Sequence, residues 1–430
     1  MPLISTKAGD SAQGYGFLAA AAKYNFISNF YTTAQLRPAA IAIDSSNNIY
    51  ITNDDGGSQV FTDKFSSTGL TIWQKGLNSA ANEYGGGITV DSSGNIIIAG
   101  SVNISSNYRH YVAKYDSSGT LQWQRYIGSS SAGNPNLSRC VTTDSSGNIF
   151  IGGQSSNGTN WIGVILKYNS SGTLQWQKTN DAGGGADTTL WGITTDSAGN
   201  CYLVGNSNGV FYVAKYNTSG TLQWQRYPNN LGYGYGVGKD STDNIYIAGA
   251  IYSAGVPDCY IAKYNSSGTL QWQKKLSTAN DDLYQAVAVD SSGNSYAAGY
   301  SYNGTRNEIV IAKRDSSGTL QWQRKISTSV ALNAVGIVLD STTNYVVSAK
   351  LVGSPYDQYL TLKFPTDGSL TGTYVVNTYS ITYAASSLTD ASGGGTSGTP
   401  TNTTSTPAWT DTAASLTDGS TSFTNALLNF

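Results

Sequence analysis

The 430-residue chain is poor in charge and in the residue types that favour helices. Asp, Glu, Lys and Arg together make up 12% of it, with a single methionine and only two glutamates, Glu83 and Glu308. Glycine, at 49 residues, and tyrosine, at 30, are abundant beside many Ser, Thr and Asn. This composition is typical of an all-β protein with many turns.

Cysteine and histidine are too few to support common metal or disulfide chemistry. The three cysteines, Cys140, Cys201 and Cys259, show no CxxC spacing, so we predict neither a disulfide framework nor a zinc site. Cys201 stands where four related segments carry Ile, so we interpret it as a small core residue. We predict no cofactor and no bound metal.

Two further absences bear on partners and location. A net charge of −2 with scattered Lys and Arg argues against a nucleic-acid partner, which needs a concentrated basic face. No run approaches the eighteen apolar residues of a membrane span, so we expect no membrane insertion. The first residues lack the features of a secretory signal, so any route out of a cell is expected to be a different one.

The dominant positive feature is a repeat of about fifty residues. A turn motif, DSSGN or a near copy, begins seven times, at Asp44, Asp91, Asp144, Asp196, Asp240, Asp290 and Asp340. A second motif, SSGTLQWQ or a near copy, places tryptophan at Trp73, Trp123, Trp176, Trp224, Trp272 and Trp322, with Gly372 at that position in the seventh copy. Between the motifs lies a lysine in every copy: Lys64, Lys114, Lys167, Lys215, Lys263, Lys313 and Lys363.

Each copy has the pattern of four strands. In the second copy these are Gly87–Val90, the apolar run Ile96–Gly100, Tyr111–Tyr115 and Thr120–Tyr126. Such a unit is too small to hold its own core, so stacking of neighbours must bury it. We therefore predict a seven-bladed β-propeller of four-stranded antiparallel blades over residues 39–380. Residues 1–38 form an N-terminal anchoring or closure segment, and residues 381–430 a Gly/Ser/Thr-rich linker and tail.

Two resemblances add to this interpretation. The pairing of DSSGN with AKYDSSGTLQW resembles the bacterial β-propeller repeat labelled SBBP, which implies a fold but no activity. The segment GDSAQGYGF is similar to the Gly-Tyr-Gly-Phe starts of structural proteins of tailed phages, particularly those of marine and cyanobacterial hosts.

The repeated Asp and Lys have a structural explanation. The first and third strands of a blade run parallel, so both residues lie at one end, where the lysine can meet the carboxylate or the turn carbonyls. The aspartate can also cap its own turn. A calcium site is the alternative, but the further acidic ligands of a calcium loop are missing.

Variation in length separates two faces of the ring. The turns after the first and third strands barely change, whereas the other two connections vary, and antiparallel geometry puts these together on one face. Diversified loops on a rigid scaffold commonly bind ligands. The candidate binding residues there are Tyr84, Arg109, His110, Arg139, Trp161, Trp191, Tyr233, Tyr235, Tyr252, Tyr284, Tyr302, Arg306 and Tyr356, with Glu308 nearby. The alternative is that several of these rings pack between blades.

Catalysis has little support in the sequence. His110 has no candidate nucleophile as partner, so a triad is not predicted. A carboxylate pair drawn from the loop acids Glu83, Asp187, Asp281 and Asp282 would suffice for a glycosidase, but their spacing singles out no pair.

These observations favour a non-enzymatic virion component, either a tail fibre or spike module or a protein on the tail or capsid. The variable face would bind host glycan or another virion protein, the terminal segments would contact other virion proteins, and several copies would be present. The segment Asn25–Tyr31 would either add to the last blade or dock onto a neighbour. The alternatives are a bacterial extracellular or surface interaction protein and a polysaccharide-degrading enzyme.

Overall fold

The computed structural model describes residues 25–29, 37–54, 60–78, 83–104, 106–128, 135–181, 187–227, 231–352, 358–376, 379–392, 403–405, 411–413, 417–420 and 425–429. Every regular element in these ranges is a β-strand. Accordingly, this part of the chain contains no helix of the length and apolarity needed to cross a membrane.

Seven sheets form the blades. Blade 1 comprises β2 (Arg37–Ile43), β3 (Ile49–Asp54), β4 (Val60–Phe65) and β5 (Thr71–Asn78). Blade 2 comprises β6 (Glu83–Val90), β7 (Ile96–Ile104), β8 (Asn107–Tyr115) and β9 (Leu121–Ile127). Blade 3 comprises β10 (Asn136–Thr143), β11 (Ile149–Ser156), β12 (Trp161–Tyr168) and β13 (Leu174–Asp181). Blade 4 comprises β14 (Thr188–Thr195), β15 (Cys201–Ser207), β16 (Val210–Tyr216) and β17 (Leu222–Arg226).

The remaining blades follow the same antiparallel order. Blade 5 comprises β18 (Gly232–Lys239), β19 (Ile245–Ser253), β20 (Val256–Tyr264) and β21 (Leu270–Ser277). Blade 6 comprises β22 (Asp282–Val289), β23 (Ser295–Tyr302), β24 (Asn307–Arg314) and β25 (Leu320–Ser327). Blade 7 comprises β26 (Ala331–Leu339), β27 (Asn344–Val352), β28 (Gln358–Pro365) and, from the other end of the chain, β1 (Asn25–Asn29).

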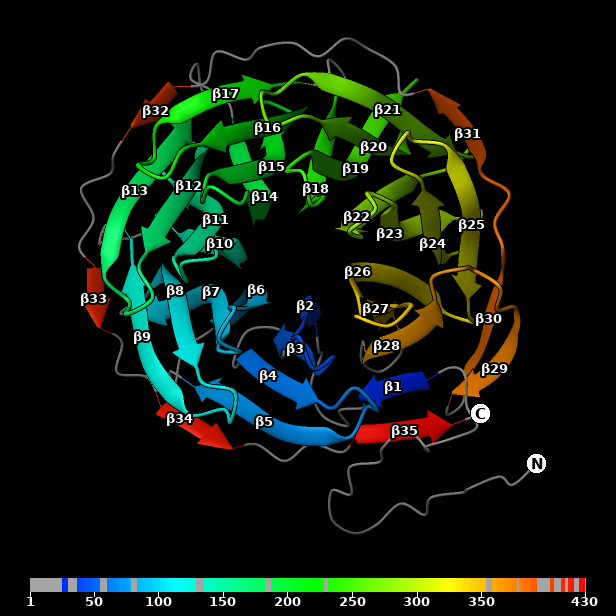
Figure 1. Cartoon of the computed structure of the whole chain (residues 1–430), viewed down its shortest axis with the longest axis horizontal. Helices are drawn as coiled ribbons and strands as arrows, with labels where there is room; N and C mark the ends of the chain where they lie inside the picture. Colours follow the sequence, from blue (N-terminus) through cyan, green and yellow to red (C-terminus); the bar gives the residue numbers. More distant parts are fainter. Residues whose placement is uncertain are drawn as a thin grey trace.

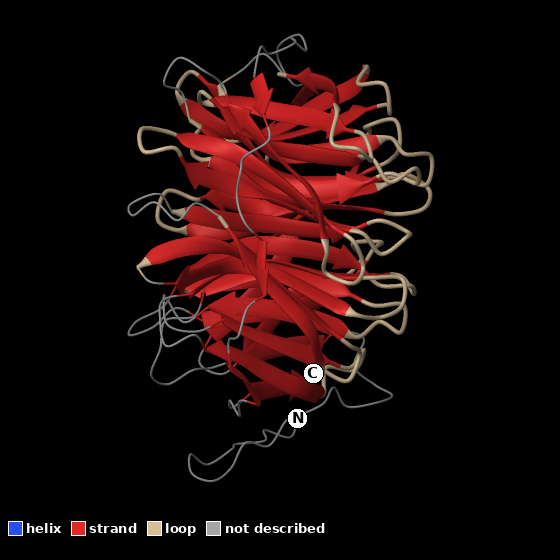
Figure 2. Ribbon diagram, turned by 90° about the vertical axis from the view of Figure 1, so that its left-hand side faces the viewer, coloured by secondary structure: helices blue, strands red, loops and turns tan. Residues whose placement is uncertain are grey.

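The blades form a ring with the first strand of each blade innermost (Figure 1). Seen from the side, the loops project from two opposite faces of the disc (Figure 2). The predicted fold class is confirmed: an all-β, seven-bladed propeller of four-stranded antiparallel blades. The predicted boundary between residues 38 and 39 falls inside β2, which begins at Arg37.

The core lies between blades. The second strand of blade 2 is buried along Ile96–Gly100, as its continuous apolar run predicts. One apolar cluster joins Ile97 and Val112 of blade 2 to Ile151 and Val164 of blade 3. Because each cluster combines two blades, one blade alone has no core of its own.

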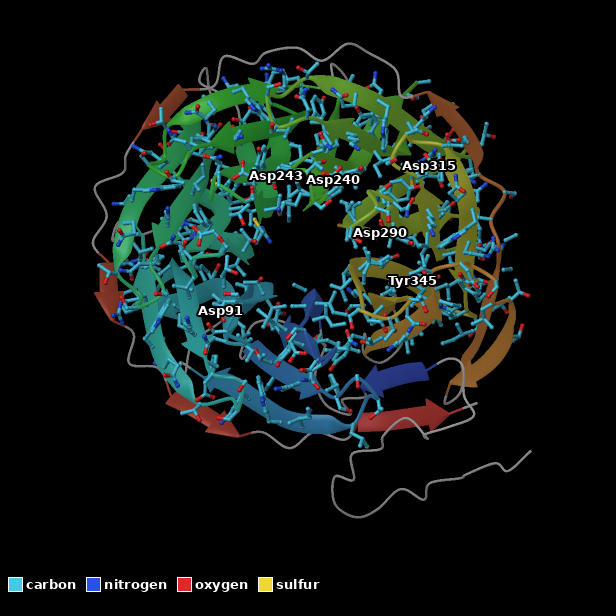
Figure 3. All side chains as sticks on the ribbon, in the orientation of Figure 1. Asp91, Asp240, Asp243, Asp290, Asp315 and Tyr345 are labelled. Carbon is cyan, nitrogen blue, oxygen red and sulfur yellow. The ribbon has the colours of Figure 1, made fainter. Side chains whose placement is uncertain are left out.

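The repeated aspartate caps its turn in all seven blades. In blade 2, Asp91 Oδ1 accepts hydrogen bonds from the backbone N–H groups of Ser93 and Asn95, both at 2.9 Å. Its other oxygen lies 2.9 Å from Lys114 Nζ, and equivalent ion pairs join Lys215 to Asp196 and Lys363 to Asp340. Figure 3 labels three of the turn aspartates, Asp91, Asp240 and Asp290. The lysine contacts the carboxylate as the sequence predicts.

The same lysines link each blade to the next. At six of the seven interfaces, the lysine Nζ and the tryptophan Nε1 donate to one backbone carbonyl in the following blade's outer turn. For blade 4, Lys215 and Trp224 lie 3.2 and 3.1 Å from the carbonyl oxygen of Ser266. The glycine of that turn, Gly268, has a φ of +79° and lies flat on the Trp224 ring. A side chain is excluded there by both the backbone conformation and the ring.

The interface between blades 7 and 1 is built differently. Here β1 pairs with β28 in antiparallel register, so the N-terminal segment completes blade 7, the first of its two predicted roles. The Tyr359 hydroxyl of blade 7 donates to Asp63 Oδ2 of blade 1 at 2.7 Å, and both side chains are fully buried. Other blades place Ala or Leu at the position of Asp63. Burial raises the pKa of Asp63 to about 6, against the opposing effect of its hydrogen bonds.

The C-terminal residues run around the outside of the ring in reverse order. The strands β29 (Gly372–Val376) and β30 (Tyr379–Ala385) form a hairpin whose β30 pairs with β25 of blade 6. Next, β31 (Thr389–Ser392), β32 (Thr403–Ser405), β33 (Asp411–Ala413) and β34 (Thr417–Ser420) pair with the outer strands of blades 5, 3, 2 and 1. Finally β35 (Asn425–Asn429) pairs with β1.

Where this region is described, outer strands stand in place of the predicted linker, and residues 393–402 lie outside the described residues. A side-chain contact fixes their register at one point: the buried Arg314 of blade 6, which stands where four blades have tyrosine, pairs with Asp390. The composition misleads because Gly, Ser and Thr favour a linker, whereas the strands are held by backbone hydrogen bonds to edges already formed.

The glycine on the tryptophan ring can be tested by a matched pair of substitutions. Gly268→Ala would place Cβ 2.7 Å from the Trp224 ring, whereas Gly209, with a φ of +73°, has open space around it. Gly209→Ala should cost about 1 kcal/mol of unfolding free energy from the backbone alone. Gly268→Ala should cost about 1–3 kcal/mol more because the ring must shift. Urea denaturation measures both; equal losses would contradict the ring contact.

Asp63 predicts a pH dependence of stability. Because its folded pKa, about 6, exceeds the ordinary value of 3.8, the contribution of Asp63 to stability is full below pH 4 and is lost as the pH rises through 6. Asp63→Asn should therefore raise the unfolding free energy at pH 7 by roughly 2–3 kcal/mol and have little effect near pH 4. Asp91→Asn is the control and should destabilise, since hydrogen bonds from Asn95 and Lys114 outweigh burial and lower the Asp91 pKa.

Candidate functional site

The innermost strands each carry one β-bulge, and the bulged residues differ from blade to blade. The register shifts place Arg139 at the bulge of β10, Trp191 at that of β14 and Tyr235 at that of β18. The equivalent residues are Ala39, Gly86, Gln285 and Val335 in blades 1, 2, 6 and 7. A bulge redirects the side chain of its extra residue. Three adjacent blades thus present large side chains at one level around the axis of the ring.

These side chains form a continuous cluster with two more from blade 5. The Arg139 guanidinium lies 4.6 Å from the centroid of a Trp191 ring, and Trp191 lies 5.9 Å from Tyr235. Tyr235 stacks on Tyr233 at 6.2 Å, and Tyr233 meets Tyr252 edge-on, also at 6.2 Å. We call Arg139, Trp191, Tyr233, Tyr235 and Tyr252 the axial cluster. It extends toward the face of the variable loops, where β18 begins and β19 ends.

The cluster is partly buried and partly open. Tyr252 is 38% exposed, and the other four members are half-buried. Burial, with smaller effects of Tyr300, Tyr233 and Tyr252, raises the pKa of Tyr235. The hydroxyl is therefore neutral at ordinary pH and able to donate and accept hydrogen bonds. Fixed rings next to neutral hydroxyls and one cation suit binding far better than acid–base chemistry.

Two of the candidate residues lie deep between blades. His110 is buried, with its two ring nitrogens 3.0 Å from the hydroxyls of Ser138 and Ser155 in blade 3. Tyr284 is also fully buried, and burial raises its pKa well above the ordinary value. For these two, the structure supports the alternative of packing between blades.

The remaining candidates lie apart from the cluster. Arg109 and Arg306 donate to the carbonyls of Gly128 and Thr328, at 2.7 and 2.9 Å, and so hold loops of their own blades. Tyr84 contacts Tyr108, and the backbone N–H of Trp161 donates to Asp187. Tyr302 is exposed at the end of β23. Tyr356 lies outside the described residues.

Each of the loop acids whose side chain is described has surroundings of its own. Asp187 is exposed and accepts the Trp161 N–H, whereas Asp282 is buried and accepts the Thr278 hydroxyl at 2.9 Å. Asp281 is exposed, Glu308 pairs with Lys325 at 3.3 Å, and the side chain of Glu83 lies outside the described residues. Within the described ranges, no three His, Cys, Asp or Glu side chains are grouped to hold a metal ion.

Sequence reasoning missed two neighbours of the cluster. Tyr300 on β23 contributes to raising the Tyr235 pKa, and Asn206 on β15 accepts from Trp191 Nε1 at 3.4 Å. Both occupy one position of the second strand, where the other blades have Asp54, Ser101, Gln154, Ala250 and Lys350. Comparing that position across the seven copies would have flagged it as variable.

A family model described as "Domain of unknown function (DUF5122) beta-propeller" matches residues 92–121 and 241–270. Each matched segment runs from an inner turn to the outer turn of one blade, in blades 2 and 5. No curated protein matches the chain. The chain is thus a β-propeller repeat protein, a class defined by architecture.

Solved structures support the same architecture. A catalytically inactive histidine-to-alanine variant of virginiamycin B lyase from Staphylococcus aureus, with quinupristin, is 14% identical with a TM-score of 0.54, covering 79% of this chain and 99% of that one. The polysaccharide lyase Uly1 is 10% identical with a TM-score of 0.50, covering 84% and 94%. At such identities the likeness shows the fold alone.

His110 gives a second pH-dependent prediction. Burial lowers the pKa of His110 to about 3, so only the unfolded chain takes up a proton between pH 6.5 and 3. The free energy of unfolding therefore decreases as the pH is lowered through that range. From pH 7 to pH 5 the loss should be about 2 kcal/mol. His110→Gln keeps a hydrogen-bonding side chain that does not titrate. The difference between variant and wild type in urea denaturation, followed from pH 7 to 5, isolates this effect; a constant difference would contradict it.

Proposed function

We propose that this chain is a non-enzymatic binding and structural component of a tailed-phage particle, whose variable face binds carbohydrate through the axial cluster. The observation that carries the proposal is the unbroken line of side chains from Arg139 to Tyr252. The line spans three blades, and its bulged residues differ from those at the same positions of the repeat in the other blades. Departure from the repeat at adjacent positions is what a dedicated binding surface requires.

The chemistry of the cluster fits a glycan. Aromatic rings provide a large contact area and lose few rotamers on binding, and tyrosine hydroxyls at their edges bond to sugar hydroxyls. The rings are also held in place by one another before any ligand binds. Such preorganisation lowers the entropy cost of association.

The virion part of the proposal is supported by the resemblance of GDSAQGYGF to phage structural proteins. A chain whose outer strands cover the blade edges is also suited to a particle exposed to harsh conditions, since exposed edges promote aggregation. The non-enzymatic part is supported by the loop acids: Asp187 accepts from the backbone N–H of Trp161, Asp282 accepts from the Thr278 hydroxyl, and the histidine is buried.

The binding function can be tested with two substitutions in the cluster and one outside it. Trp191→Ala and Tyr235→Ala should each weaken binding to any glycan that the wild type captures on an array by more than about tenfold, as for hot-spot residues. Tyr302→Ala, an exposed tyrosine of blade 6 outside the cluster, should leave affinity within about twofold. Equal losses for all three, or none, would reject the cluster as the binding site.

The particle assignment needs its own measurement. Mass spectrometry of purified virions should detect the chain among the structural proteins, and its absence from particles would reject the virion role while leaving glycan binding open. Depolymerase assays on the same glycans should show no turnover. Activity lost on substitution of Asp187 or Asp281 would instead favour the polysaccharide-degrading alternative.

A further inference from the structure

Arg139 stands apart from the other arginines of the chain. Six of them, Arg109, Arg125, Arg226, Arg306, Arg314 and Arg324, each donate to at least one backbone carbonyl within 3.1 Å. Among the described residues, no acceptor meets the guanidinium of Arg139. Its Nε is buried without a hydrogen bond, as are the Nε atoms of Arg109 and Arg314, whose other nitrogens are bonded. No acidic side chain in these ranges pairs with it either.

The surroundings of Arg139 leave its charge uncompensated. On one side lies the Trp191 ring, which contacts the face of the guanidinium. The ring offers no acceptor to the N–H groups, which point outward in the plane of the guanidinium. On the other side the bulged residue of blade 2 is Gly86, which contributes no side chain. A guanidinium remains protonated in proteins, so the five N–H donors of Arg139 stay charged and available.

Such an arrangement is costly unless a partner completes it. A partly buried charge without a counter-charge destabilises the folded chain, as do buried donors without acceptors. In this chain the same residue type is otherwise supplied with carbonyls, which shows that the repeat can satisfy an arginine. An external anion would satisfy Arg139, and the planar fork of the guanidinium matches the two oxygens of a carboxylate.

The opposite end of the cluster has the other sign. The exposed Asp281 lies near Tyr252 and Tyr300 and contributes to raising the pKa of both. The anionic group of a ligand lying along the rings should therefore face Arg139, away from Asp281. Charge thus gives the site a direction.

We propose that the axial cluster binds an acidic glycan, with a sugar carboxylate on Arg139 and adjoining sugar rings on Trp191 and Tyr235. This rests on the proposed glycan-binding function and specifies the chemical class of its ligand. The recognised unit is a sugar that carries a carboxylate, held by a bidentate ion pair beside an aromatic surface.

The test uses matched ligands and the full-length chain. A panel of carboxylated oligosaccharides (oligomers of galacturonic, glucuronic and mannuronic acid, and sialylated glycans) is compared by calorimetry with neutral oligomers of equal length. At least one acidic ligand should bind more than tenfold tighter than its neutral counterpart. Arg139→Gln should remove this preference, because the affinity for the acidic ligand should fall far more than that for its neutral counterpart. Arg139→Lys should retain only part of the preference, because it keeps the charge without the fork.

Each outcome has a defined meaning. A neutral glycan bound as tightly as its acidic counterpart, or a preference that survives Arg139→Gln, would overturn the acidic-ligand proposal and leave the glycan-binding function intact. Failure of every glycan, acidic and neutral, would overturn both. If Arg139→Gln does not fold, salt dependence of the wild type decides: affinity for the acidic ligand alone should fall between 50 and 300 mM NaCl, and equal salt responses would reject the proposal.

Discussion

At six of the seven interfaces, a single backbone carbonyl in an outer turn links one blade to the next. It accepts hydrogen bonds from a lysine and a tryptophan of the preceding blade, as Ser117 does from Lys64 and Trp73. The same lysine lies next to the aspartate that caps its own blade's inner turn, so each blade's turn geometry is tied to its neighbour's. The glycine following the carbonyl must take a positive φ and must lack a side chain, because the tryptophan ring lies against it. Packing between strands buries most of the apolar surface, and the contact of the lysine and tryptophan with the carbonyl fixes the position of one blade relative to the next.

The repetition of that contact explains why the fold could be predicted from the sequence. Lysine, tryptophan and glycine recur at fixed spacings because the repeated interface needs the same three groups. The seven copies of the repeat therefore predict seven blades. The seventh interface breaks the rule: the seventh copy has Gly372 in place of the tryptophan, and that residue lies in β29 on the sheet of blade 6. Asp63 and Tyr359 link blades 7 and 1 instead. The aromatic, strand-like character of Asn25–Tyr31 predicted a strand that either adds to the last blade or docks onto a neighbour, and β1 takes the first of these roles. The outer strands could not be predicted, because they are bound through backbone atoms whose partner edges exist only after the ring has formed.

The candidate site was predictable in part and for a similar reason. Length variation located the variable face, and five of the residues proposed there meet in one cluster. His110 lies on the third strand of blade 2 and Tyr284 on the first strand of blade 6, and both side chains point to the buried side of their strands. For Tyr284, the bulge at Gln285 hides the alternation of the strand in the sequence. Trp191 and Tyr235 reach the axis because they are the bulged residues themselves. The blades are related by nearly sevenfold symmetry, and the axial cluster lies where the side chains of adjacent blades depart from that symmetry.

The position of β1 between β28 and β35 also constrains how the chain can be assembled. The strand made first must wait for a neighbour roughly 330 residues later in the sequence before it has an edge to join. At ordinary rates of synthesis this delay is about 20–70 s, during which blade 7 cannot be complete. The ring therefore closes only after β28 has been translated, and a chain whose synthesis stops before β28 would be open with a bare edge.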